Sequence, residues 1–134
     1  YTKKIQIEAR VLGDLAMNHI IPVATKYQSD LIDNAYKAQK LFPAEKAAIL
    51  SAKNIDLIEQ IAGLNNFIEE NVARMIEARK VANRIGGQYD KAIAYHDTVA
   101  PKLEELRSYI DDLEEVVDDS LWPLPKYREL LFIR

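Results

Sequence analysis

The most regular pattern of apolar and polar positions runs from Pro43 to Ile85. Apolar residues recur there at alternating steps of three and four, so they form one stripe along a helix. The two lines of this repeat are Leu50, Leu57, Leu64, Asn71, Ala78 and Ile85, and Asn54, Ile61, Ile68, Met75 and Ala82. The stripe is widened by Ile58 and Val72 on one flank, and by Phe67 and Val81 on the other. A stripe of this width predicts a long helix that contacts two neighbours.

Similar periodicity predicts a long helix on each side of the central one, over about residues 2–41 and 89–118. Pro22 and Pro101 lie inside these helices, and an interior proline removes one backbone hydrogen bond and clashes with the preceding turn. We therefore expect a kink before Pro22, and either a kink or a break before Pro101. The two connections are short, which favours antiparallel neighbours. The pair Gly86-Gly87 is expected to close the central helix in a left-handed conformation.

These patterns predict an all-α fold, an elongated up-down-up bundle of three long helices over residues 1–119, with the central helix at about 44–85. A Pro-rich apolar tail follows at residues 120–134, where closely spaced prolines prevent a regular helix. We interpret this tail as a docking segment. Its proposed contact anchors are Trp122, Leu124, Tyr127 and Leu131. Bundle and tail form a single domain, and because the first residue is Tyr1 rather than Met, we interpret the chain as a fragment of a longer protein.

Composition limits the classes of partner. The net charge is −3, which argues against nucleic acid or an anionic membrane as a partner, because both need a concentrated positive field. The chain has no cysteine, so disulfides and thiolate chemistry are excluded and a cytoplasmic location fits. No apolar run approaches the length that a membrane-spanning helix needs.

Few residues are candidates for chemistry. His19 and His96 are the only histidines, and His96 falls on the apolar stripe of the third helix. We expect a buried imidazole bonded to a polar neighbour rather than a metal ligand. Asn54 and Asn71 lie on the central stripe and predict a buried polar layer that fixes the register of the helices.

The charged clusters are interpreted as solvated helix faces or as surfaces that pair with a partner. The acidic cluster comprises Asp111, Asp112, Glu114, Glu115, Asp118 and Asp119, and the basic one comprises Arg74, Arg79, Lys80 and Arg84. On a helix the carboxylates fan outwards, and the glycine-centred pattern of a calcium loop is missing. We therefore expect no catalytic, cofactor-binding or metal-binding residue in this chain.

Two stretches are more specific than a helical bundle requires. One is residues 9–22, ARVLGDLAMNHIIP, and the other is residues 121–132, LWPLPKYRELLF, which directly follows an acidic run ending in Asp118-Asp119. Together these stretches resemble the C-terminal region of type III glutamine synthetase, the long-chain bacterial form of the enzyme.

This resemblance implies a parent enzyme that joins ammonia to glutamate, using ATP and Mg or Mn, in a cytoplasmic double ring of twelve subunits. The family's catalytic motifs lie upstream, so none is carried onto this chain. The resemblance thus implies a non-catalytic structural domain that contacts the catalytic domain of the same chain and neighbouring subunits. A free-standing helical interaction or adaptor module is the alternative, and sequence upstream of residue 1 would separate the two.

Overall fold

The structure, a computed structural model, describes residues 1–117 and contains no β-strand over that range. The helices are α1 (Thr2–Leu15), α2 (Ile21–Leu41), α3 (Ala44–Asn83), α4 (Gln88–Ala94) and α5 (Ala100–Val116). Two π-helical turns, η1 (Ala16–Ile20) and η2 (Tyr95–Val99), join α1 to α2 and α4 to α5. Because each π turn continues the helical path, the chain forms three long rods. The all-α class is confirmed.

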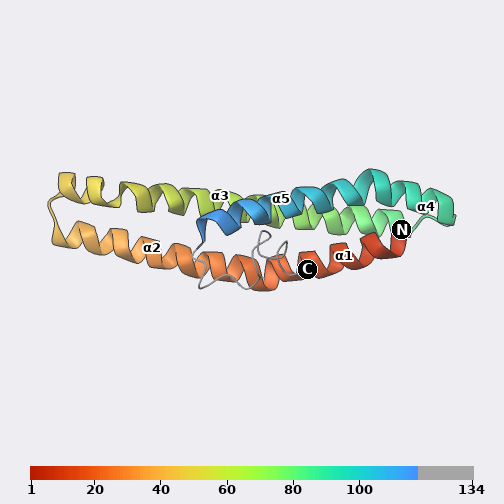
Figure 1. Cartoon of the computed structure of the whole chain (residues 1–134), viewed down its shortest axis with the longest axis horizontal. Coiled ribbons are helices and arrows are strands. Elements are labelled where there is room, and N and C mark those ends of the chain that lie inside the picture. Colours follow the sequence, from red (N-terminus) through yellow and green to blue (C-terminus); the bar gives the residue numbers. More distant parts are fainter. Residues whose placement is uncertain (118–134) are drawn as a thin grey trace, which may run out of the picture.

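The three rods lie side by side along one long axis (Figure 1). The first rod (α1, η1 and α2) ends at Phe42, whose extended backbone has φ −117° and ψ 157°. Pro43 then precedes α3 as its N-cap, where a missing N–H leaves no hydrogen bond unmade. The chain returns along α3, and the third rod (α4, η2 and α5) packs against α1 and α3.

The core follows the stripe that the sequence predicts along α3. Asn71 lies on this stripe and donates from Nδ2 to the carbonyl oxygen of Lys102 in α5, at 2.8 Å. The line at seven-residue steps that contains Asn71 therefore faces α5. The second line supplies buried residues of the shared core, namely Ile61, Ile68, Met75 and Ala82. From α5 and η2 the core receives Tyr95, Val99, Leu103, Leu106, Ile110 and Leu113.

Each interior proline is preceded by a π turn. The N–H groups of Ile21 and Ala100 donate to carbonyls five residues earlier, those of Ala16 and Tyr95. Such i→i+5 bonds open a wider turn. In a regular α-helix, each proline ring would clash with the carbonyl four residues earlier, and the wider turn relieves this conflict. The helix therefore continues past Pro22, and at Pro101 it does not break.

The π turn η2 overturns one prediction. His96 was expected on the buried stripe, but its side chain is 73% exposed. Tyr95 is buried in its place, and its hydroxyl donates to Oδ1 of Asn83. A π turn contains one residue more than an α turn, so the position that points inwards shifts by one.

Two further expectations are wrong. Phe67 and Val81, placed on the flank of the α3 stripe, are 52% and 50% exposed, so the third rod covers that flank only in part. Phe67 still stacks on Tyr109 of α5, with ring centroids 5.4 Å apart. The Gly86-Gly87 turn uses no positive φ, since none occurs in residues 1–117. Instead α3 closes with tight bonds from the Arg84 and Ile85 N–H groups to carbonyls three residues earlier.

Beyond the end of α5, α2 and α3 continue together as a two-helix arm, which we define as residues 28–58 (Figure 1). At its base, Nε2 of Gln28 donates to the carbonyl of Ile58, at 3.0 Å. Small buried residues hold the two helices close, and these are Ala35, Ala47 and Ser51. Leu50 belongs to the stripe that faces α5, yet it lies in the arm beyond the end of α5 and is 52% exposed. The stripe for a third helix therefore extends further than the third helix does.

Candidate contact surfaces

The histidines do not form a site. His19 is exposed on η1 and His96 is exposed on η2, where Nδ1 lies 3.0 Å from the Asp97 carboxylate. The His96 ring also lies beside the ring of Tyr1, at 6.2 Å between centroids. Over residues 1–117, no group of three His, Asp or Glu side chains is placed to hold a metal ion.

The predicted polar layer is present at Asn71, which is 2% exposed, while Asn54 is only half-buried. Sequence reasoning missed two other buried polar residues of α3, Ser51 and Asn65. The oxygen atoms Ser51 Oγ, Asn65 Oδ1 and Asn71 Oδ1 have no hydrogen-bond partner within the described chain. Buried polar residues on an apolar stripe commonly fix the register of packed helices.

The acidic cluster lies along the outside of α5, with Asp118 and Asp119 outside the described residues. Partial desolvation raises the pKa of Asp111 above its ordinary value of 3.8, and repulsion from Asp112 and Glu115 raises that pKa further. One ion pair joins this helix to the first rod, because Arg107 lies 2.8 Å from Glu8 while also bonding Glu104.

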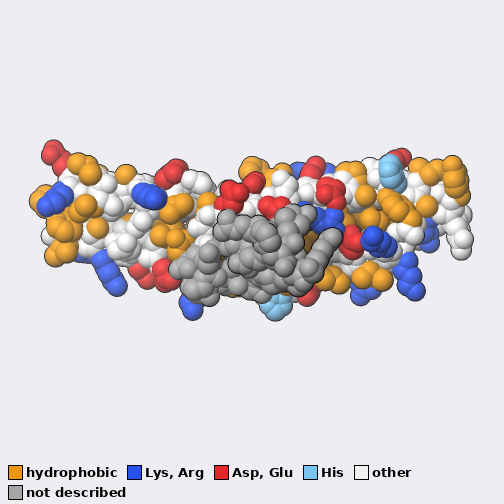
Figure 2. All heavy atoms as spheres, in the orientation of Figure 1, with side chains coloured by type: hydrophobic (Ala, Val, Ile, Leu, Met, Phe, Trp, Pro, Cys, Tyr) orange, Lys and Arg blue, Asp and Glu red, His pale blue; other side chains and the backbone are white. Residues whose placement is uncertain are grey.

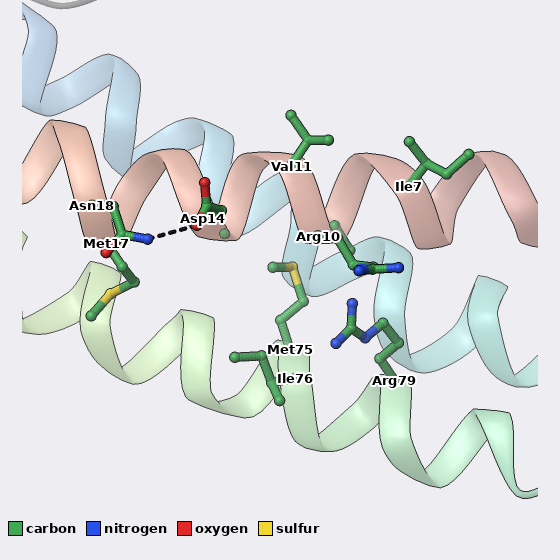
Figure 3. A pocket seen from close by; sticks show the side chains of 11 residues that line it. Ile7, Arg10, Val11, Asp14, Met17, Asn18, Met75, Ile76 and Arg79 are labelled. Carbon is green, nitrogen blue, oxygen red and sulfur yellow. Dashed lines mark hydrogen bonds between the residues drawn. The ribbon is translucent and has the colours of Figure 1, made fainter.

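A groove of about 700 Å³ runs between α1 and α3 (Figure 3). Its apolar lining includes Met17 of η1 and Ile76 of α3, and it reaches Ile7 and Val11 on the edge of α1 that points away from α3 (Figure 3). At its floor Gly13 allows a close approach, since a Cβ added there would lie 3.3 Å from Cε of Met75. The ribbons of the third rod pass behind α1 and α3 in Figure 3, so the groove opens on the opposite face of the bundle.

Two arginines stand at one end of this groove. Arg10 of α1 and Arg79 of α3 point their guanidinium groups towards each other (Figure 3). Neither forms an ion pair with a carboxylate of residues 1–117, whereas Arg74 pairs with Glu70 at 3.9 Å. Arg74 and Arg79 belong to the same basic cluster, but only Arg74 has an ion-pair partner among residues 1–117. Asp14, the acidic residue lining the groove, accepts a hydrogen bond from Asn18 at 2.6 Å.

The arm is a second apolar surface. Figure 2 shows hydrophobic side chains on it between charged ones. Its exposed apolar residues are Ile32, Tyr36, Leu41, Ile49, Leu50 and Ile55. Leu41 and Ile49 are 76% and 77% exposed. The predicted anchors Trp122, Leu124, Tyr127 and Leu131 lie outside the described residues. No helix of residues 1–117 is both long and apolar enough to span a membrane.

The amino-acid sequence of this chain is similar to sequences of known proteins. Residues 1–40 match the family model described as the glutamine synthetase C-terminal domain. A glutamine synthetase of Bacteroides fragilis is 49% identical over 134 residues, which is 100% of this chain and 18% of that protein. Over its whole length, this chain is similar to the C-terminal part of that glutamine synthetase.

Two more distant glutamine synthetases agree with this placement. A type-3 glutamine synthetase of Dictyostelium discoideum is 29% identical over 137 residues, covering 100% of this chain and 18% of the relative. A glutamine synthetase of Butyrivibrio fibrisolvens is 21% identical over 132 residues, which cover 98% of this chain and 18% of that protein. The chain therefore spans less than a fifth of the length of the glutamine synthetases it matches.

The groove was missed by sequence reasoning, although a signal for it was present. Ile7 and Val11 are four residues apart on α1 and lie off the stripe that packs into the core. They are 53% and 61% exposed. Apolar residues at that spacing on an outer face indicate a second contact surface.

Proposed function

We propose that this chain is the non-catalytic C-terminal contact domain of a type III glutamine synthetase. The observation that carries the proposal is the full-length match to the C-terminal part of a glutamine synthetase, at 49% identity. The type III assignment is supported by the two stretches at residues 9–22 and 121–132, and by a relative that is named as a type-3 enzyme.

In this proposal, the parent joins ammonia to glutamate at the expense of ATP, with Mg or Mn, in the cytoplasm. The reaction takes place in the part of the parent that precedes this region. The bundle contributes contact surface to a ring of twelve subunits, either against its own catalytic domain or against a neighbour.

Two surfaces suit that role. The arm exposes a row of apolar side chains in a position that a third helix would otherwise cover, with Leu50 as an example. The tail adds the aromatic and aliphatic anchors Trp122, Leu124, Tyr127 and Leu131. Large anchors of this kind commonly supply most of the binding energy of an interface.

The proposal is tested by Trp122→Ala in the full-length enzyme. Loss of a buried anchor costs about 2 kcal/mol or more, so we expect smaller assemblies at low protein concentration and a lower melting temperature. Light scattering and thermal unfolding measure both. Tyr89→Ala is the matched control, because Tyr89 is 78% exposed at the start of α4. Unchanged assembly and melting of the Trp122 variant would count against the proposal.

A free-standing helical adaptor is the second candidate, since exposed apolar rows such as that of the arm also suit a binding module. The two candidates differ in what precedes residue 1. Several hundred residues with metal-binding and nucleotide-binding motifs favour the synthetase, and a reading frame that starts just before Tyr1 favours the adaptor.

A further inference from the structure

The groove between α1 and α3 has the shape and chemistry of a docking site. Its apolar walls remain open in the described chain, with Ile7 53%, Val11 61% and Ile76 38% exposed. The floor is closed, because Gly13 and Met75 are buried against each other. A segment laid in this groove would cover apolar surface on both helices without displacing any part of the core.

Two arginines at one end of the groove favour a negatively charged group on any segment that binds there. The guanidinium groups of Arg10 and Arg79 face each other (Figure 3), and neither forms an ion pair with a carboxylate among residues 1–117. A carboxylate placed between two guanidinium groups accepts charge-assisted hydrogen bonds from both. The groove thus matches a segment with an apolar row and one Asp or Glu at the level of the arginines.

The position of the groove points to the source of that segment. In the glutamine synthetases that match this chain, more than four fifths of the sequence lies outside the matched region, which is their C-terminal part. The groove begins at Ile7, and at 1.5 Å per residue this is about 9 Å along the helix from Tyr1. Polypeptide that precedes residue 1 therefore enters beside the groove, and tethering gives it a local concentration of about a millimolar or more.

We propose that the α1–α3 groove binds an acidic, apolar segment of the same long protein that precedes residue 1. Apolar side chains of that segment cover Met17 and Ile76, and its carboxylate bonds Arg10 and Arg79. This inference rests on the proposed function, because it requires the longer chain. It adds the surface through which the bundle is attached to the rest of the enzyme.

A zero-length cross-link identifies the occupant directly. In the full-length enzyme, Arg79→Lys places an amine at the end of the groove, and a water-soluble carbodiimide joins that amine to a carboxylate in contact with it. Mass spectrometry should find Lys at position 79 linked to an Asp or Glu that precedes residue 1. Arg74→Lys is the matched control, since Glu70 lies beside Arg74 on the same helix. It should yield only the local link to Glu70.

Solvent protection is the second measurement. The chain has no cysteine of its own, so Ile76→Cys introduces a single thiol into the groove. Val81→Cys is the control, on the same helix but outside the groove, where Val81 is 50% exposed. We expect a maleimide to label the thiol at position 76 at least tenfold more slowly than the thiol at position 81. In the Ile76→Cys background, Arg10→Glu with Arg79→Glu should increase the labelling rate, whereas Arg74→Glu should not.

Three outcomes overturn this inference. These are links from position 79 only to residues 1–134 of this region, no link at all, and equal labelling at positions 76 and 81. If Ile76→Cys lowers the melting temperature, Met17→Cys provides the groove thiol instead, since Met17 lines the groove and is 38% exposed. A free groove combined with a damaging Trp122→Ala would refute the groove and leave the contact role standing. An occupied groove combined with a harmless Trp122→Ala would refute the contact role of the tail and leave the groove standing.

Discussion

At the scale of single residues, the choice between Tyr95 and His96 decides how the third rod packs. Both lie in the π turn η2. Tyr95 is fully buried and bonds Asn83, and its burial raises the pKa of the phenol, an effect opposed by nearby Arg79. His96 is turned outwards towards Asp97 and Tyr1. The core at this level therefore depends on an aromatic ring rather than on a buried imidazole.

The burial of Tyr95 and the exposure of His96 predict how substitutions at these two positions change stability. Tyr95→Ala should cost about 3–5 kcal/mol of unfolding free energy, because it leaves a large cavity. Tyr95→Phe should cost only about 1 kcal/mol for the lost hydrogen bond, and His96→Ala should change stability by less than about 0.5 kcal/mol. Urea unfolding followed by circular dichroism measures all three. A larger loss for His96→Ala than for Tyr95→Ala would show that the register assigned to η2 is wrong.

Residues on an uninterrupted helical repeat could be predicted from sequence, and residues next to the prolines could not. Asn71 and Met75 are buried where the seven-residue spacing places them. His96 is not, because the repeat assumes α geometry through Pro101, and the extra residue of a π turn cannot be read from apolar spacing alone. The exposed position of Phe67 depends on how much of α3 the third rod covers, which is a tertiary property.

At the scale of elements, α5 has an unfavourable distribution of charge. Its last turn contains acidic residues and no basic one, although the C-terminal end of a helix favours positive charge. Asp111 and Glu115 are also four residues apart, where like charges repel. The packing of Leu106, Ile110 and Leu113 holds this part of the helix in place against that repulsion.

The raised pKa of Asp111 predicts how stability changes with pH. Folding disfavours the charged carboxylate, so the folded state retains the proton to a higher pH than the unfolded state does. Stability is therefore lost as pH rises from the ordinary value of 3.8 through the raised pKa of the folded state. Asp111→Asn should be more stable than the natural chain at pH 7, by about 0.2–0.5 kcal/mol, the size of one like-charge pair on a helix.

Melting curves recorded between pH 3 and pH 7 test this sign. The advantage of Asp111→Asn should vanish below the ordinary pKa of 3.8 and increase towards neutral pH. It should also shrink in about 1 M salt, where exposed charges are screened over roughly 3 Å. An advantage that is equal at every pH would contradict the electrostatic explanation.

At the scale of the whole molecule, the difference in length between the rods leaves open the surfaces on which the proposals depend. The helix α3 has 40 residues, whereas α5 has 17 and follows the short α4 and η2. The third rod therefore leaves the arm uncovered at one end, and it covers only one face of the α1–α3 pair. An all-α fold of three helices could be predicted from the apolar repeats and the turn residues. The groove could not, because it depends on which face of that pair the third rod leaves open.

The central proposal is that this region, and its tail in particular, provides contacts between subunits of a longer synthetase. The most direct test is the mass of the full-length protein, measured by light scattering with and without residues 120–134. The account predicts a large ring for the complete protein and smaller particles after removal of the tail. An unchanged mass after removal would contradict it.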